Sequence, residues 1–331
     1  MNIYDIAKLT GVSASTVSRV VNGKPGVGKE KRALIEEALR IYNYTPDENA
    51  RSLVTQSSHL IGILTDNIGS RRQNEGIARI EKEILNGGYY CFTRYTGTGK
   101  NAIAEGVEDM ARRKVEGLLV LGATFRDHAQ LQAALERYLP ETPVMLVNQS
   151  KRFDMDTVYC VGADEGKGFR RCIDRLVKRG RRRIALMVDE GRVSEKNIVG
   201  YFQDTVSRFP EVTGTVCRGV EPTVEGGTAR MRELLCEHPD IDAVLCAQDG
   251  IAVGAMYECI DSGRKVPEDV SVIGEDNSVI CGACRPKLTS LDTMLTTITE
   301  LSARILIDIL NGNERGHSVT LDMELCERES V

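Results

Sequence analysis

A chain of 331 residues is too long for one small domain and suits two or three. Its net charge of −5 excludes a protein that coats nucleic acid over its whole surface, but residues 1–56 carry +2 against −7 for the remainder, so DNA contact is expected of the N-terminal part alone. No apolar run approaches the ~20 residues of a membrane span. The first residues already predict a helix rather than a signal peptide, so we expect a cytoplasmic protein without membrane contact.

Residues 4–22, YDIAKLTGVSASTVSRVVN, predict two short helices joined by a tight turn. Gly11 permits the turn because glycine adopts positive φ without a Cβ clash, and Ser13 suits the N-cap of the second helix. Apolar side chains at helical spacing are expected to face inward. These are Ile6, Ala7 and Leu9 in the first helix and Val17, Val20 and Val21 in the second. The stretch is a helix-turn-helix.

The outward face of the second helix is small, polar and free of acidic side chains. It carries Ala14, Ser15, Thr16, Ser18, Arg19 and Asn22. Hydroxyl, amide and guanidinium donors without carboxylates suit the phosphates and base edges of a DNA major groove. We therefore expect this helix to bind double-stranded DNA.

Two more helices are predicted between residues 29 and 58. Residues 29–42, KEKRALIEEALRIY, close a small three-helix core through Ala33, Ile35, Ala38, Leu39 and Tyr42. Thr45 and Glu48 form a capping box, with Pro46 at the first helical position. The helix that they begin, residues 46–54, has about two turns and is marginal alone in water, so we expect it to fold only against a partner. Residues 55–58 form a polar linker.

From residue 60 onward, short apolar runs alternate with amphipathic helical segments. Strands are predicted at 60–65, 89–95, 117–122, 144–147, 157–161, 183–188, 214–220, 243–247, 270–274 and 289–293. Helices are predicted at 76–86, 102–114, 128–138, 166–179, 195–208, 224–237, 249–262 and 296–311. This alternation indicates parallel sheets covered on both faces, in two doubly wound α/β subdomains. Such sheets bind ligands at the carboxyl ends of their strands, so two facing subdomains make a cleft.

Several short sequence motifs occur along the chain in a characteristic order. They are YDIAKLTGVS, STVSRVVNGKPGV and the ARSL of 50–53, followed by PVMLVNQ (143–149), GRRRIALM (180–187), AVLCAQDGIAVGAM (243–256), SGRKVPEDVSVIGEDN (262–277), LTSLDT (288–293) and CERES (326–330). Together they resemble the LacI/GalR family of bacterial transcriptional regulators over nearly the whole chain.

The resemblance implies three parts. Residues 1–45 would form the all-α helix-turn-helix head, 46–58 a hinge helix and linker, and 59–331 a periplasmic-binding-protein-like body for effector binding and dimerisation. The N-subdomain of that body would hold about 59–160 plus 293–321. The C-subdomain would hold about 161–292 plus 322–331.

The resemblance also implies a homodimer, or a dimer of dimers, that binds a near-palindromic operator and acts as a repressor rather than an activator. Ala14, Ser15 and Arg19 would then face base edges, with Arg19 bonded bidentately to a guanine, and Thr16, Ser18 and Asn22 would hold phosphates. Leu53 would wedge into the minor groove, with Ala50 close to the groove floor. The competing interpretations are a solvated Arg19 and a Leu53 packed on the body.

The cleft departs from the family's pattern, which places an aromatic residue for effector stacking after the first strand. Residues 66–73, DNIGSRRQ, contain no aromatic and bring two arginines instead. Guanidinium groups bind carboxylate or phosphate in a planar fork. We therefore expect a small polar effector, by hypothesis anionic, read by Arg71 or Arg72 with Asn197, Asp249 and Asp276. The alternative is a vestigial or filled cleft whose arginines point to solvent.

The remaining motifs are weaker. The ten cysteines are expected to be free and mostly buried, but Cys281 and Cys284 form a CxxC, so a redox- or metal-responsive regulator stays as an alternative. We expect no metal site, because the histidines at 59, 128, 238 and 317 are scattered. The basic run 178–183, KRGRRR, is expected to be a solvated turn. No GxSxG or HExxH motif is present, so we expect neither an enzyme nor a cofactor.

Overall fold

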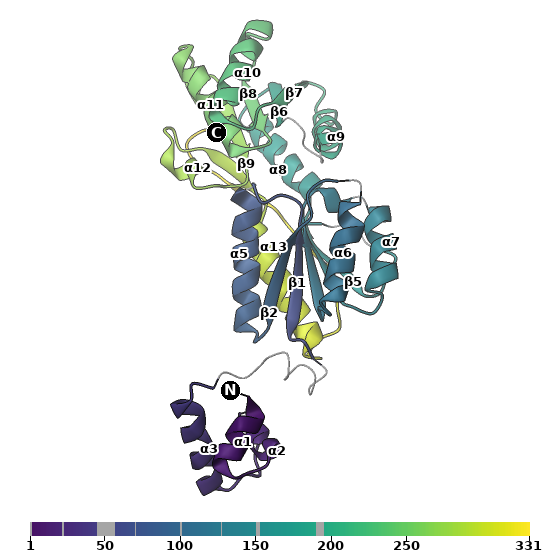
Figure 1. Cartoon of the computed structure of the whole chain (residues 1–331). Helices are drawn as coiled ribbons and strands as arrows, with labels where there is room; N and C mark the ends of the chain where they lie inside the picture. Colours follow the sequence, from purple (N-terminus) through teal and green to yellow (C-terminus); the bar gives the residue numbers. More distant parts are fainter. Residues whose placement is uncertain are drawn as a thin grey trace. The chain divides into compact units, whose positions relative to one another are not determined.

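The computed structural model describes residues 2–21, 23–44, 57–69, 71–99, 101–126, 128–149, 153–189 and 195–331, and for Arg71 and His128 the backbone alone. The chain divides into two compact units, Met1–His59 and Leu60–Val331 (Figure 1). The predicted hinge helix at 46–54, with Ala50 and Leu53, lies outside the described residues, as does the predicted DNA contact Asn22.

The described part of unit 1 is a small bundle of α1 (Ile3–Thr10), α2 (Ala14–Val21) and α3 (Lys29–Ile41). A capping box begins α1: the Asn2 side chain accepts from the amides of Tyr4 and Asp5, and the Asp5 side chain accepts from the Asn2 amide. Gly11 ends α1 with φ 65°. Ser13 Oγ accepts from the Thr16 amide at 3.2 Å, which satisfies an otherwise unpaired amide at the start of α2.

The core of unit 1 consists of Ile6, Ala7, Val17, Val20, Ile35 and Ala38. The prediction that Leu9 faces inward is wrong, because its side chain is 53% exposed and Thr10 occupies the buried position instead. The Thr10 hydroxyl donates to the Ile6 carbonyl at 2.7 Å, so its burial leaves no donor unpaired. Ala33 and Tyr42 are exposed as well. A hydrophobic period over so few residues does not fix which adjacent position meets the neighbouring helices.

Unit 2 is built on two six-stranded sheets. Sheet A has the strand order β11-β5-β4-β3-β1-β2, and sheet B has the order β12-β10-β9-β8-β6-β7. The β10–β12 pairing is antiparallel and the other pairings are parallel. The strands are β1 (Leu60–Thr65), β2 (Tyr90–Tyr95), β3 (Gly117–Leu121), β4 (Val144–Val147), β5 (Val158–Ala163), β6 (Arg183–Asp189), β7 (Thr213–Val220), β8 (Ala243–Cys246), β9 (Ser271–Glu275), β10 (Thr289–Asp292), β11 (Val319–Leu321) and β12 (Glu324–Cys326).

Helices cover both faces of each sheet (Figure 1). In sheet A, α5 and α13 share one apolar core with the strands, and α6 and α7 share another. In sheet B, α8 and α9 cover one face and α10 and α11 the other. The helices are α5 (Arg71–Asn86), α6 (Ala102–Arg112), the short 3-10 helix η1 (Thr124–Arg126), α7 (His128–Tyr138), α8 (Glu165–Lys178), α9 (Glu195–Val206), α10 (Val224–Glu237), α11 (Asp249–Asp261), α12 (Ile280–Ala283) and α13 (Leu295–Leu310).

This arrangement confirms the predicted fold class of a helical head and two doubly wound subdomains. Several details differ from the sequence prediction, among them the short helices η1 and α12, which were not predicted. Helix α5 begins at Arg71, five residues before the predicted start, because its first turn is polar and carries no apolar period. The strands β11 and β12 were not predicted, since a three-residue strand is too short to show alternation.

A row of cations on α8 fastens the last residues of the chain. Lys167 pairs with Asp322 and Arg175 with Glu327, while Arg171 and Arg179 donate to the carbonyls of Met323 and Val331. The four cationic residues recur every fourth position, the last of them at the C-cap of α8, which places them along one face of the helix. The row thus fixes the residues on either side of β12, the edge strand of sheet B.

Candidate DNA-binding helix and effector cleft

The start of α2 carries a cluster of hydroxyl groups. Ser13 Oγ lies 2.8 Å from both Ser15 Oγ and Thr16 Oγ1. Of the predicted DNA contacts, Ser15 and Arg19 are exposed, whereas Ala14, Thr16 and Ser18 are half-buried. Ala14 also packs against the core of unit 1, so it faces outward less than the sequence predicted.

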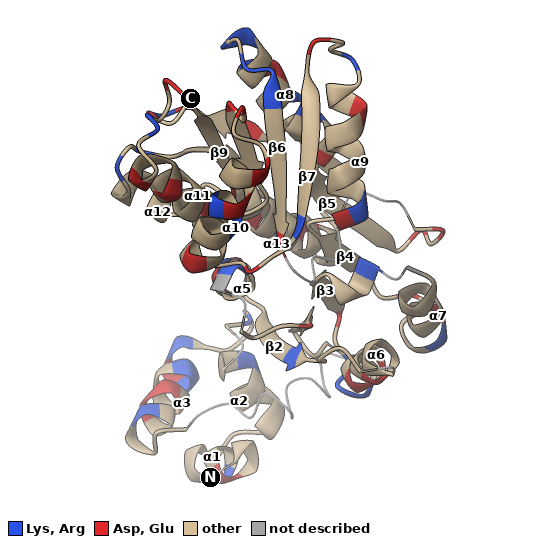
Figure 2. Ribbon diagram, turned by 90° about the horizontal axis from the view of Figure 1, so that it is seen from above, with Lys and Arg blue, Asp and Glu red and all other residues tan. Residues whose placement is uncertain are grey.

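Arg19 is the one cation of α2, and it reaches toward the loop that follows. Its Nη1 donates to the Pro25 carbonyl at 3.3 Å, and Arg32 Nη2 from α3 donates to the Lys24 carbonyl of the same loop at 2.8 Å. Helix α2 contains no acidic residue (Figure 2). An exposed guanidinium on an acid-free helix offers the donors that phosphates and guanine edges accept.

Polar side chains gather in unit 2 where the strands of sheet A end. Asp66 follows β1 and is only 4% exposed. Its carboxylate accepts from Gln73 Nε2 at 3.0 Å and from the Thr124 amide at 2.7 Å. A Cβ at Gly122 would lie 2.3 Å from this carboxylate, so the position requires glycine. Asp66 therefore fixes the loop after β3 rather than offering a free acceptor.

A cavity of about 160 Å³ lies beside this cluster. Its lining consists of Arg72, Gln73, Leu121, Gly122, Ala123, Arg126, Val147, Asn148 and Leu295. Two of these side chains are arginines and none is a carboxylate. The cavity thus presents hydrogen-bond donors and positive charge at the carboxyl ends of parallel strands, where such sheets bind ligands.

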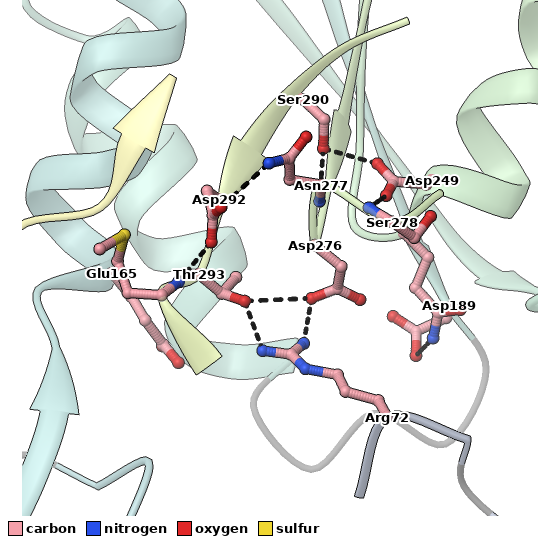
Figure 3. Close-up of polar contacts among 12 residues, drawn as sticks. Arg72, Glu165, Asp189, Asp249, Asp276, Asn277, Ser278, Ser290, Asp292 and Thr293 are labelled. Atoms are coloured by element: carbon pink, nitrogen blue, oxygen red, sulfur yellow. Dashed lines mark hydrogen bonds and ion pairs between the residues drawn. The ribbon is translucent and has the colours of Figure 1, made fainter. Parts of the chain in front are cut away.

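Each of these arginines pairs with a carboxylate that belongs to the sheet B side of the unit. Arg72 on α5 donates through Nη1 to Asp276 Oδ1 and through Nη2 to Thr293 Oγ1, and Thr293 in turn lies 3.4 Å from Asp276 (Figure 3). Arg126 on η1 lies 3.5 Å from Glu165, the first residue of α8. Two ion pairs therefore cross between elements of the two sheets.

Asp249, at the start of α11, is 3% exposed and bound on both oxygens. Oδ2 accepts from the Ser278 amide at 2.7 Å, and Oδ1 accepts from the Ser290 hydroxyl at 2.6 Å (Figure 3). Burial raises the pKa of the Asp249 carboxyl, and the hydrogen bonds from Ser290 and Ser278 oppose that rise. Asp249 joins α11, the 276–278 loop and β10, which shapes the site without projecting a free acceptor into it.

The comparisons with known proteins agree along the whole chain. The family model of bacterial regulatory proteins of the lacI family matches residues 2–47, and a periplasmic binding protein-like domain matches residues 173–331. The HTH-type transcriptional regulator CelR of Thermobifida fusca is 30% identical, over 98% of this chain and 96% of CelR. The chain belongs to the lacI family.

Other relatives in this family are transcription regulators too. The HTH-type transcriptional repressor PurR of Shigella sonnei is 30% identical over 99% of this chain and 96% of its own. Among solved structures, a lac repressor dimer bound to operator and the anti-inducer ONPF shares the fold, with a TM-score of 0.85 and 24% identity over 100% of this chain and 98% of that one. This lacI-family protein is a DNA-binding transcription regulator with an effector-binding domain.

The structure of this lacI-family regulator brings together part of the predicted effector site. Arg72 and Asp276 are in contact, whereas Asp249 is one loop away and engaged internally. Asn197 is exposed on the first turn of α9, with no recorded hydrogen bond to these residues in the described part of the chain. The side chain of Arg71 lies outside the described residues. Arg126 and Asn148 also line the cavity but were not predicted from the sequence. Each follows a strand of sheet A, and parallel sheets bind ligands at the carboxyl ends of their strands, so their positions could have indicated them.

The redox and metal alternative receives no support. Cys281 and Cys284 are free and buried. Burial raises the pKa of the Cys281 thiol to about 12, so little of the reactive thiolate exists near neutral pH. Within the described ranges, no three or more His, Cys, Asp or Glu side chains are placed to hold a metal ion.

The basic run 178–183 is more than a solvated turn. It lies between α8 and β6 (Figure 2). Arg181 donates to Ser271 Oγ at 2.9 Å and to the backbone carbonyls of Pro267, Glu268 and Asp269, while Arg183 pairs with Asp240 at 3.1 Å. The run therefore stabilises sheet B. Throughout the described part of the chain, no helix combines the length and apolar character that crossing a membrane requires.

Proposed function

We propose that this regulator is a repressor that binds a near-palindromic operator as a homodimer and that a small polar effector in unit 2 controls it. The observation that carries the proposal is the acid-free outer face of α2, on which Ser15 and Arg19 are exposed and Arg19 donates to the Pro25 carbonyl. In this proposal Arg19 reads a guanine, with Ser15 and Ala14 facing neighbouring base edges, and Thr16, Ser18 and Asn22 hold phosphates. Ala50 and Leu53 enter the minor groove from residues 46–58, which connect the head at 1–45 to the body at 59–331.

The proposed effector binds in the cavity beside Arg72 and Arg126, facing Asp276. The lining of two arginines, Gln73 and Asn148 favours a polar ligand with an anionic group. One relative was solved as a CelR–cellobiose complex, with a TM-score of 0.68 and 24% identity over 100% of both chains. A neutral sugar is therefore the natural comparison ligand for this chain.

The decisive experiment selects operators from a random DNA pool with the full-length protein. We expect an enriched, near-palindromic sequence whose half-sites are spaced for a two-fold dimer. Addition of an effector should then change the affinity for that sequence, since coupling between the two sites is reciprocal. Enrichment of no sequence, or of a single asymmetric half-site only, would contradict the proposal.

Exposed apolar side chains support the proposed dimer. In unit 2 they include Leu85 on α5, Tyr90 and Tyr95 on β2, Tyr257 and Ile260 on α11, and Val279 before α12. Strand β2 is also an edge of sheet A, with one side unpaired within the described chain. Helices α5, α11 and α12 lie on the same side of unit 2 in Figure 1. Exposed apolar side chains on helices of one side of the unit, together with an open sheet edge, are typical of an interface.

Leu85→Glu together with Ile260→Glu is expected to convert the dimer to monomers, because two carboxylates would lose their hydration in an apolar contact. Sedimentation velocity at micromolar concentration measures the change. Leu34→Glu is the matched control, since Leu34 is a comparably exposed leucine on α3 of unit 1. A double variant that sediments like the wild type would show that this side of unit 2 is not the interface.

A further inference from the structure

Two ion pairs, Arg72–Asp276 and Arg126–Glu165, form what we call the clasp. In both pairs the arginine and the carboxylate come from opposite sides of unit 2. Both arginines come from the sheet A side, on α5 and on η1 after β3. Both carboxylates come from the sheet B side: Asp276 directly follows β9, and Glu165 begins α8, which packs against α9 and β12. Each pair therefore connects the two halves of unit 2.

All four side chains of the clasp are partly shielded from water. Those of Arg72 and Asp276 are 32% and 22% exposed, and those of Arg126 and Glu165 are 28% and 21% exposed. Water and salt screen such pairs less than fully exposed pairs, but solvent still reaches them, so each charged group can exchange its partner for another ion. The clasp can thus be opened by a competing ion.

The acceptors on Arg72 imitate an oxyanion. One arm of its guanidinium donates to Asp276 and the other to the hydroxyl of Thr293, and these two oxygens lie 3.4 Å apart. A single carboxylate or phosphate offers two oxygens to the same planar fork and binds it bidentately. Asp276 and Thr293 together therefore engage both of the guanidinium arms that an external oxyanion would need.

The cavity beside the clasp fits the same chemistry. It is lined by both arginines and by no carboxylate. Its volume of about 160 Å³ is below the range of roughly 300–1,000 Å³ typical of pockets for larger ligands, which favours a small anion over a disaccharide.

We infer that the effector is a small carboxylate or phosphate anion that displaces Asp276 from Arg72, and that its binding opens the two halves of unit 2. The inference rests on the proposed function, in which this cavity is the effector site. The displaced carboxylates repel the bound anion. The anion and the carboxylates of the clasp therefore compete for the same arginines, and the two halves are held together only when the carboxylates are bound. Asp276 and Glu165 then determine specificity, because a neutral sugar cannot compete with them for a guanidinium.

The test measures anion affinity by calorimetry on the full-length protein, with inorganic phosphate, acetate, succinate and neutral glucose as the probes. Asp276→Asn is expected to raise the affinity for the preferred anion about 10-fold, because removing the competing carboxylate increases the fraction of the protein in which Arg72 is available. Asparagine tolerates the positive φ of 105° at this position, so the backbone is preserved. Arg72→Gln should abolish anion binding. Glu195→Gln is the matched control, since Glu195 pairs with Arg218 at 2.8 Å elsewhere in the sheet B half.

Hydrogen exchange supplies the second measurement. Opening should speed exchange of the amides of 276–278 and 293–295 when anion is added. Slower exchange there, unchanged affinity in Asp276→Asn, or tighter binding of glucose than of every anion would each overturn the inference. Operator binding without ligand is measured separately. If the protein binds operator but no anion, the inference about the anionic effector is wrong and the proposed DNA-binding function stands. If it binds anion but selects no operator, the proposed function is wrong.

Discussion

Arg19→Ala is expected to abolish specific operator binding while leaving the fold and the dimer intact. A bidentate arginine–guanine pair contributes about 1–3 kcal/mol of discrimination, and a dimer loses one pair in each half-site, so specific affinity should fall by roughly 30-fold or more. Binding to unrelated DNA should change much less, because phosphate contacts elsewhere remain. Fluorescence anisotropy with the selected operator and a scrambled duplex measures both quantities.

The control must separate base reading from support of the loop. Arg19 also donates to the Pro25 carbonyl, so its removal loosens the loop after α2. Arg32→Ala loosens the same loop at Lys24 without altering the face of α2. We expect Arg32→Ala to retain operator discrimination. Equal loss of discrimination in the two variants, or full discrimination in Arg19→Ala, would contradict the assignment of Arg19 as a base-reading residue.

Long, periodic elements were predictable from the sequence, and short ones were not. The ten predicted strands of the body all exist. Most are apolar runs that a parallel sheet buries, whereas the edge strands β2 and β7 are largely exposed or half-buried. The edge strands β11 and β12 depend instead on tertiary partners, such as the cations of α8 that hold Asp322 and Glu327. The prediction that Leu9 faces inward is wrong because Thr10 takes the core position instead, where its hydroxyl donates to the Ile6 carbonyl.

The cleft was predictable only in part, since sequence reveals residue types but not their partners. Arg72 and Asp276 stand out as charged residues at strand and helix ends, yet nothing in the sequence indicates that they bind each other. Arg126 lies in a short 3-10 turn that carries no motif. Asp249 was expected to read the effector, but its two oxygens are already bound by Ser278 and Ser290.

Asp249→Ala is accordingly expected to destabilise unit 2 rather than only to weaken a ligand. Its removal leaves the Ser278 amide and the Ser290 hydroxyl without their acceptor beside a buried cavity. Each buried unpaired donor costs about 1–3 kcal/mol, so the loss of the acceptor for two donors is expected to lower the free energy of unfolding by about 2–6 kcal/mol, measured by urea denaturation. Asp249→Asn keeps the shape and one acceptor and should restore most of it. Asp261→Asn, at the exposed end of the same helix, should have no effect.

The difference in unfolding free energy between wild type and Asp249→Ala is expected to depend on pH, because burial raises the pKa of the Asp249 carboxyl. A carboxyl whose pKa is higher in the folded than in the unfolded state stabilises the fold fully below its unfolded value. That contribution is lost as the pH rises through the folded value. The gap in stability between wild type and Asp249→Ala should therefore be largest in acid and shrink toward neutral pH. A gap that widens with rising pH would mean that the ionised carboxylate is the favoured form, and a stable Asp249→Ala variant defective only in effector binding would return Asp249 to the effector site.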